Sequence, residues 1–293
     1  NRIGFSLRHG DVLGLVGPNG AGKTTLLKIL STLVVPSKGQ AYVMRHSVRR
    51  HAHFVRINIG FMPDSTGVKE DMTVREYLNF YAALYLVEVK ARSREIGRVL
   101  EAVGLKRRAA SRIGELSLGM QQRLSVARLL LHDPKVLLLD EPAAGLDPGA
   151  RIELRETIAR LASAGKTILV SSHILSDIAR TCTKVAVLEK GELLFLGPLS
   201  DLVSRTAREG RRFRVVLDPE KAPAAEILLR EQGQGLVVER TGAGLRVSPP
   251  NDPEAPGRVF AALARNGLLP RTFREEEPDL EAAFLRLTKG DVT

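Results

Sequence analysis

The stretch GPNGAGKTT at residues 17–25 places three glycines and one lysine between the apolar run Val12–Val16 and the sequence LLKIL. It fits the pattern G-x-x-x-x-G-K-[ST]. The glycines let backbone N–H groups turn toward phosphate oxygens, which residues with side chains cannot do without strain. The start of a helix adds positive partial charge at the same place. The loop predicts nucleotide binding through Gly17, Pro18, Asn19, Gly20, Ala21, Gly22, Lys23, Thr24 and Thr25.

Two side chains of this loop have separate expected roles. Lys23 would place its ammonium group between the β- and γ-phosphates, and Thr24 would offer its hydroxyl to Mg²⁺. A glycine turn without any ligand is the alternative interpretation. The position of the stretch between a strand and a helix favours the phosphate site.

Two adjacent acids, Asp140 and Glu141, end the apolar stretch VLLLDE at residues 136–141. Acids at the carboxyl end of a buried strand lie where α/β sheets bind ligands. Such a pair on an ordinary surface turn would be solvated charge, but the phosphate loop upstream favours a catalytic role. We expect Asp140 to hold Mg²⁺ through water and Glu141 to polarise the attacking water. The pattern therefore predicts nucleotide hydrolysis.

The first two thirds of the chain alternate strand and helix patterns, which predicts a mostly parallel α/β sheet. Continuous apolar runs are typical of strands buried on both faces. Helices at Thr73–Val87 and Glu95–Val103 would form an insertion between the second and third strands, and Leu124–Leu131 would be helical up to Pro134. The expected strands are Val12–Val16, Ile57–Met62, Val136–Asp140, Thr167–Ser171, Lys184–Glu189 and Glu192–Leu196.

The composition changes near residues 204–210, and a small α+β domain is expected beyond it. Its patterns follow the order βαββαβ, which indicates a ferredoxin-like arrangement, and TGAG at residues 241–244 supplies a hairpin turn. A last helix, Leu280–Leu287, follows Pro278. The expected strands are Arg212–Leu217, Leu236–Glu239, Leu245–Val247 and Leu269–Arg274, and the expected helices are Ala224–Glu231 and Glu254–Asn266.

The formal net charge of +11 favours a polyanionic partner, or it serves only solubility. Aromatic residues make up 4% of the chain, which leaves few side chains to stack on bases, so no stable nucleic-acid complex is expected. Apolar runs such as Val136–Leu139 are far shorter than the roughly 20 residues that cross a bilayer. The single Cys182 cannot form an intrachain disulfide. These features predict a cytoplasmic protein.

Three further segments make the phosphate-loop assignment specific. Residues 116–124, LSLGMQQRL, resemble the signature motif of ATP-binding cassette (ABC) ATPases, usually written LSGGQ-x-QR. Residues 144–148, AGLDP, resemble the D-loop of that family, and residues 171–173, SSH, resemble its switch histidine. The motifs occur in the family's order. The resemblance implies a P-loop ABC ATPase domain at residues 1–204 with a helical subdomain at about 70–125, and an accessory domain at 211–293.

The resemblance also implies how the motifs act. In the family, two nucleotide-binding domains face each other head to tail, and each ATP is closed by the opposite signature motif. Ser117 and Gly119 would then bind the γ-phosphate of the partner's ATP, and Asp147 would lie at the dimer interface. His173 would bond the γ-phosphate and orient the water. Without the resemblance, Ser117 would be a helix cap and His173 an ordinary polar residue.

This chain departs from the family pattern at several positions. Leu118 and Met120 replace a glycine and a glutamine of the signature, as in similar forms among drug-export and ABC-2-type ATPases. Asp64 occupies the position of the Q-loop glutamine and is a candidate Mg²⁺ ligand with a shorter arm. The family's first strand, with its adenine-stacking aromatic residue, would lie before Asn1, so the domain is expected to be incomplete at its N-terminus.

The closing sequence EPDLEAAF with LRLT, within residues 277–288, is similar to the tail of ABC-2-type ATPases. The resemblance therefore implies the ATPase subunit of an exporter, a homodimer with ATP and Mg²⁺ as cofactors. It would lie on the inner face of the cell membrane beneath membrane-spanning permease subunits. A soluble ABC ATPase acting on the ribosome or nucleic acid, or a binding module with ATP as a structural ligand, are the alternatives.

Overall fold

The computed structural model describes residues 3–64, 71–174, 178, 181–202, 212–232, 235–242, 244–249 and 254–276. Its contacts divide the chain into two compact units, Asn1–Leu199 and Ser200–Thr293. The sequence predicted the change between residues 204 and 211.

A six-stranded sheet forms the centre of the first unit, in the order β4-β5-β6-β1-β7-β8. All neighbouring strands are parallel except β7 and β8, which are antiparallel. Strands β1, β5 and β6 are buried along almost their whole length, as their apolar runs predicted. The predicted mostly parallel sheet is confirmed. The strands are β1 (Val12–Val16), β4 (Ile59–Met62), β5 (Val136–Leu139), β6 (Thr167–Ser172), β7 (Lys184–Glu189) and β8 (Glu192–Gly197).

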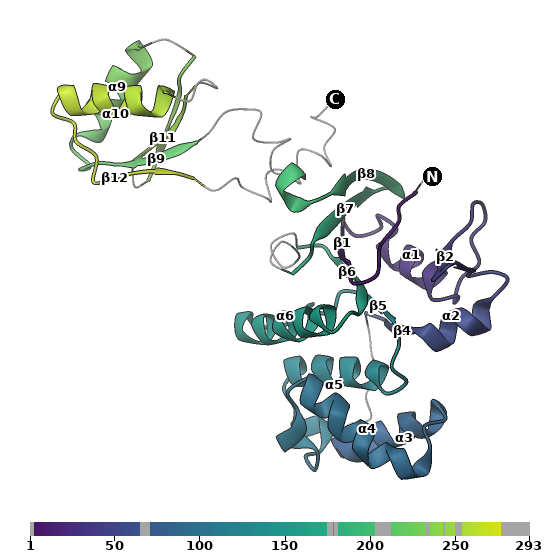
Figure 1. The fold of residues 1–293 in the computed structure, drawn as a ribbon. Coiled ribbons are helices and arrows are strands. Elements are labelled where there is room, and N and C mark those ends of the chain that lie inside the picture. The colour runs from purple at the N-terminus through teal and green to yellow at the C-terminus, as the bar shows by residue number, and fades with distance from the viewer. Residues whose placement is uncertain are drawn as a thin grey trace. The chain divides into compact units, whose positions relative to one another are not determined.

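Helices lie on both faces of this sheet (Figure 1). Helix α1 (Lys23–Leu30) follows β1, α2 (Ala52–Asn58) precedes β4, and α6 (Pro148–Ser163) joins β5 to β6. A short hairpin of β2 (Tyr42–Val43) and β3 (His46–Ser47) lies between α1 and α2. The predicted strand Ile57–Met62 is wrong at its start, because Ile57 and Asn58 end helix α2.

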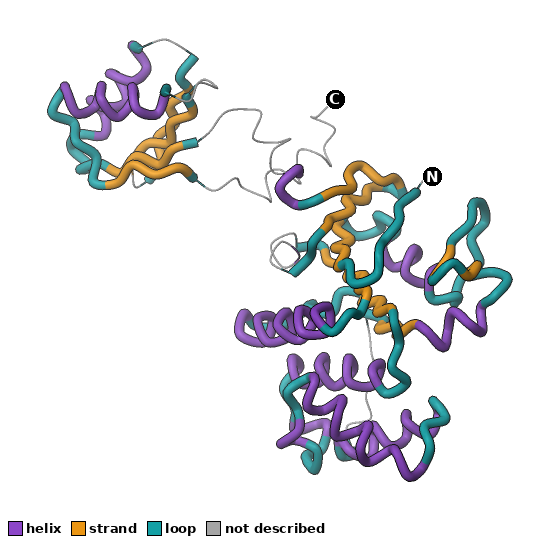
Figure 2. Tube along the Cα trace, in the orientation of Figure 1, coloured by secondary structure: helices purple, strands orange, loops and turns teal. Residues whose placement is uncertain are grey.

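The helical insertion lies between β4 and β5, where the sequence predicted it, and is seen as a separate helical layer (Figure 2). Its first helix begins at a capping box in which Thr73 and Glu76 satisfy each other's backbone N–H groups. The predictions for the other two helices began too late in the sequence. The helices are α3 (Val74–Leu84), α4 (Val89–Ala102) and α5 (Leu118–Leu130), with single 3-10 turns at Lys106–Arg108 and Ile113–Glu115.

Two apolar clusters stabilise the first unit. The larger one joins the helical insertion and α6 to one face of the sheet, and includes Leu78, Leu100, Leu124 and Leu137. The smaller one lies under α1 and α2 on the other face and includes Leu27. The strands that carry the functional motifs are therefore fixed by packing on both faces.

The second unit contains a four-stranded antiparallel sheet in the order β10-β11-β9-β12. Its elements follow the predicted order, strand-helix-strand-strand-helix-strand, and enclose a core of their own around Val215, Leu229 and Leu263. The elements are β9 (Phe213–Val216), α9 (Ala222–Glu231), β10 (Val237–Thr241), β11 (Gly244–Ser248), α10 (Ala255–Arg265) and β12 (Thr272–Glu275).

The predicted closing helix Leu280–Leu287 lies outside the described residues. Within the residues that the structure describes, every helix is too short or too polar to cross a lipid bilayer.

Candidate nucleotide-binding site

The phosphate loop connects the end of β1 to the start of α1. Gly20 and Gly22 have φ angles of 81° and 101°, in the left-handed region that glycine adopts without strain. Gly17 lies against the neighbouring strand, where an added Cβ would be 2.3 Å from the carbonyl oxygen of Leu188. At these three positions the motif's glycines are required by the backbone. The loop conformation is therefore built into the sequence.

Lys23 is the first residue of α1 and is only 6% exposed. Its Nζ donates to the carbonyl oxygen of Gly17 at 2.6 Å and to that of Pro18 at 3.3 Å. The same atom lies 3.3 Å from Oε1 of Glu141. The ammonium group is thus held inside the loop, at the centre of the candidate site.

Asp140 and Glu141 directly follow β5. Asp140 is 1% exposed, and its Oδ1 accepts a hydrogen bond of 2.7 Å from Ser171 Oγ. Glu141 has a φ angle of 46°, which turns the chain sharply out of the strand. The turn separates the two carboxylates, because Asp140 stays buried while Glu141 borders the pocket of the phosphate loop.

His173 comes from the residues just after β6. Its Nδ1 lies 2.8 Å from Oε2 of Glu141, and its backbone N–H donates to the same oxygen at 3.4 Å. Glu141 therefore has Lys23 on one carboxylate oxygen and His173 on the other. Three residues that lie far apart in the sequence form one polar cluster.

A pocket collects most of the residues predicted for nucleotide binding. The structure thus brings together the phosphate loop, the candidate base and the residue at the Q-loop position. The pocket is lined by Pro18, Asn19, Gly20, Ala21, Gly22, Lys23, Thr24, Thr25, Asp64 and Glu141.

Ser117 and Gly119 are not among the lining residues of that pocket. Ser117 is exposed as the N-cap of α5, and its Oγ accepts from the N–H of Met120 at 3.3 Å. Gly119 is buried, and an added Cβ would lie 2.5 Å from the Cβ of Ala150 in α6. Asp147 caps α6 through a 3.0 Å bond from the N–H of Ala150. The signature and D-loop segments therefore pack against each other.

Oxygen atoms of the pocket and of the buried Asp140 behind Glu141 fit a magnesium ion that accompanies a nucleotide. Oδ2 of Asp140 is buried and has no hydrogen-bond partner among the described residues. Thr24, the second residue of α1, lines the pocket next to Lys23. No group of three or more His, Cys, Asp or Glu side chains that could hold a metal occurs in the described part of the chain.

Ser171 is a site residue whose part the sequence did not reveal. It appeared there only as the first residue of SSH. In the structure its hydroxyl contacts both acidic residues, since it donates to Asp140 and accepts from the N–H of Glu141 at 2.8 Å. The available signal for this role was a serine near the end of the strand that follows the acidic pair in the sequence.

Comparisons with known proteins agree with this site. The family model described as "ABC transporter" matches residues 1–144. The chain is 32% identical to the Nod factor export ATP-binding protein I of Rhizobium johnstonii, over 98% of this chain and 89% of that protein. It is 28% identical to the linearmycin resistance ATP-binding protein LnrL of Bacillus subtilis, over 98% of this chain and 92% of that one.

The fold agrees as well. The structure of cbiO1 from Clostridium perfringens, part of the ABC transporter complex cbiONQ, matches with a TM-score of 0.64 and 25% identity, over 70% of this chain and 83% of that one. The chain therefore belongs to the ATP-binding proteins of ABC transporters, ATPases that power transport, and among these to the drug- and Nod-factor-export kind.

Proposed function

We propose that this chain is the nucleotide-binding subunit of a membrane exporter, in which two copies close head to tail on two ATP molecules and reopen after hydrolysis. The observation that carries the proposal is the position of Glu141 between Lys23 and His173, beside the phosphate loop. A carboxylate at this point can accept a proton from a water molecule that attacks the γ-phosphate.

The residues divide the work of ATP hydrolysis among them. Backbone N–H groups of the loop and the Lys23 ammonium would bind the phosphates and offset the charge that develops on them. Glu141 would orient the water and accept its proton as oxygen bonds to phosphorus and the bond to the ADP oxygen breaks. His173 would hold Glu141 in place and contact the γ-phosphate.

Asp140, through water, and the hydroxyl of Thr24 would hold Mg²⁺, which neutralises charge on the phosphate oxygens. Asp64 borders the same pocket and would be an additional ligand from the Q-loop position. The buried and unpartnered Oδ2 of Asp140 supports this assignment. An unsatisfied carboxylate oxygen in a protein interior is costly unless a ligand satisfies it.

The residues that close each nucleotide site from the opposite side would come from the partner copy. Ser117 is exposed at the N-terminus of the 13-residue helix α5, where N–H groups and the helix dipole favour an anion. Asp147 is also exposed and lies near Ser117 in the fold. Ala150 connects the two places, because its N–H donates to Asp147 and its side chain lies against Gly119 at the start of α5. These residues do not line the pocket of their own copy, as the head-to-tail arrangement requires.

Membrane-spanning permease subunits would be the partners, and the helical insertion would carry the docking surface. Tyr77 of its first helix is 3% exposed and belongs to the core, whereas Phe80 and Leu84 are 52% and 60% exposed. The outer edge of α3 is therefore available for contact. The protein would act in the cytoplasm, at the inner face of the cell membrane.

The second unit would be an accessory domain with a ferredoxin-like arrangement. Its element order and the antiparallel strand order β10-β11-β9-β12 support this assignment, because the first and third strands pair at the centre. With the cassette, this would give two domains at residues 1–204 and 211–293.

The oligomeric state of Glu141→Gln tests the proposal. With Mg²⁺ and ATP the substituted protein should form a stable dimer by light scattering, because ATP binds but is not hydrolysed. Adding Ser117→Arg, which places a long side chain at the exposed cap, should return it to a monomer. A monomeric Glu141→Gln protein with ATP bound, or hydrolysis at the parent rate, would overturn the proposal.

A further inference from the structure

Ser171 lies beside the acidic pair because of strand register. Strands β5 and β6 are parallel, and Leu139 of β5 pairs with Val170 of β6. Asp140 follows Leu139 and Ser171 follows Val170, so these two residues are neighbours at the ends of the paired strands. Ser171 is fully buried, with 0% of its surface exposed.

The hydroxyl of Ser171 makes two hydrogen bonds, one as a donor and one as an acceptor. Oγ donates to Oδ1 of Asp140 at 2.7 Å and accepts from the backbone N–H of Glu141 at 2.8 Å. A serine hydroxyl has one proton to donate, and this geometry uses it on the carboxylate. One buried atom thus ties together a side chain and the backbone of the next residue.

The backbone that it ties down is strained. Glu141 has a φ of 46°, a left-handed conformation that is uncommon for residues other than glycine and needs surrounding contacts to persist. The hydrogen bond from its N–H to Ser171 is such a contact. The same turn directs the Glu141 side chain toward Lys23 and His173.

We infer that Ser171 is a positioning residue for ATP hydrolysis, which fixes the rotamer of Asp140 and the turn at Glu141 through one hydroxyl. The inference rests on the roles proposed above for these two acids. With Oδ1 of Asp140 bound by Ser171, Oδ2 is the oxygen left for a ligand. Serine at this position would therefore support both the metal-binding oxygen and the candidate base.

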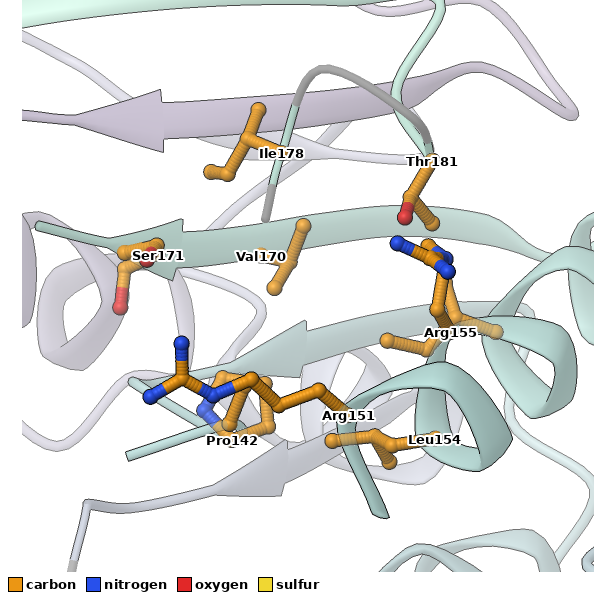
Figure 3. A pocket seen from close by; sticks show the side chains of 11 residues that line it. Pro142, Arg151, Leu154, Arg155, Val170, Ser171, Ile178 and Thr181 are labelled. Atoms are coloured by element: carbon orange, nitrogen blue, oxygen red, sulfur yellow. The ribbon is translucent and has the colours of Figure 1, made fainter. Parts of the chain in front are cut away.

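Threonine is the substitution at Ser171 that keeps a hydroxyl group on a buried strand. Figure 3 shows Ser171 and Val170 on one strand at the edge of a small cavity, with Pro142 and Arg151 on the other side. A threonine keeps the hydroxyl and adds one methyl group. Threonine also suits a strand.

The test compares Ser171→Ala and Ser171→Thr with Ser172→Ala as the matched control. Ser172 is the neighbouring buried serine, and its Oγ accepts from the N–H of Ile174. Steady-state ATPase assays would give kcat and KM for each variant. Titration of Mg²⁺ against binding of a fluorescent ATP analogue would be done in the Glu141→Gln background, where no turnover is needed. Thermal unfolding would show whether each variant is folded.

For Ser171→Ala we expect kcat to fall at least tenfold with KM for ATP within about twofold, and the Mg²⁺ concentration for half-maximal binding to rise several-fold. Ser171→Thr should restore both values, and Ser172→Ala should resemble the parent. Parent values for a folded Ser171→Ala protein would overturn the inference. If Ser171→Ala does not fold, a Ser171→Thr protein that folds but stays inactive would overturn it. Glu141→Gln that hydrolyses ATP normally would instead refute the proposed base.

Discussion

The ammonium nitrogen of Lys23 lies 3.3 Å from Oε1 of Glu141, and both side chains are largely buried, at 6% and 14% exposure. The residue proposed to bind phosphate is thus paired with the residue proposed to activate water. A γ-phosphate that enters the pocket must share this lysine with the carboxylate, and its negative charge also opposes that of Glu141. The pair therefore opposes nucleotide binding.

Glu141→Gln should consequently tighten ATP binding as well as stop hydrolysis. Without the Glu141 charge, Lys23 is free to bind phosphate and the repulsion between Glu141 and the γ-phosphate is gone. The free energy of ATP binding should improve by about 1 kcal/mol, or roughly fivefold in Kd. Calorimetric titration with a non-hydrolysable ATP analogue measures the Kd of each protein. Glu156→Gln, an exposed residue of α6, is the matched control and should keep the parent Kd. Equal Kd values for Glu141→Gln and the parent would contradict the expectation.

Lys23→Ala should weaken ATP binding by about 2 to 3 kcal/mol, the scale of charge-assisted hydrogen bonds to phosphate. Lys28 provides the control, because it lies on the same helix but is exposed at the surface. Lys28→Ala should bind ATP like the parent in the same titration. If the two alanine variants have equal affinity, Lys23 does not bind phosphate.

The sequence alone was enough to locate the phosphate loop and the acidic strand. The conformations needed at Gly17, Gly20 and Gly22 restrict those positions to glycine, so the requirement is visible in the residue types. The buried strand β5 likewise needs a continuous apolar run before Asp140. Local requirements of this kind leave a readable pattern.

Contacts between distant segments left no such pattern. The hydrogen bonds of Ser171 to the acidic pair join residues about thirty positions apart and depend on strand register. The pairing of Glu141 with His173 has the same origin. Helix α2 was missed because its seven residues are too few to show a helical period, and Ile57 looked like the start of the next strand.

Cys182 should be almost unreactive in the folded protein. It is free and half-buried in the structure, and burial raises the pKa of its thiol from the ordinary 9.0 to about 12. Since the thiolate is the reactive form, alkylation by iodoacetamide at pH 8 should be at least a hundredfold slower than in urea. The chain has one cysteine, so the rate reports this site alone.

The same shift predicts how stability depends on pH. Above about pH 9 the unfolded state loses the Cys182 proton while the folded state keeps it up to about 12. The unfolded state then binds fewer protons, so the free energy of unfolding falls as pH rises in this range. Cys182→Ala should lose this part of the dependence, as urea melts at pH 8 and 10 would show. An identical slope in both proteins, or equally fast alkylation of native and unfolded chains, would contradict the buried thiol.

Two glycines in neighbouring helices should respond in opposite ways to alanine. In α5, a Cβ at Gly119 would lie 2.5 Å from the Cβ of Ala150, so Gly119→Ala must push α5 and α6 apart and should cost about 1 to 3 kcal/mol. In α4, a Cβ at Gly97 would meet nothing within 4 Å, so Gly97→Ala should stabilise the helix by up to about 1 kcal/mol.

Thermal unfolding would show these changes as a lower and a higher Tm. Because Gly119 lies between Ser117 and the start of α6, its substitution should also weaken the ATP-dependent dimer of the Glu141→Gln protein, whereas Gly97→Ala should leave that dimer intact. A lower Tm with an undiminished dimer would mean that the contact with Ala150 supports only the fold. A weaker dimer at an unchanged Tm would instead place Gly119 directly at the interface, without the packing cost that its distance to Ala150 predicts.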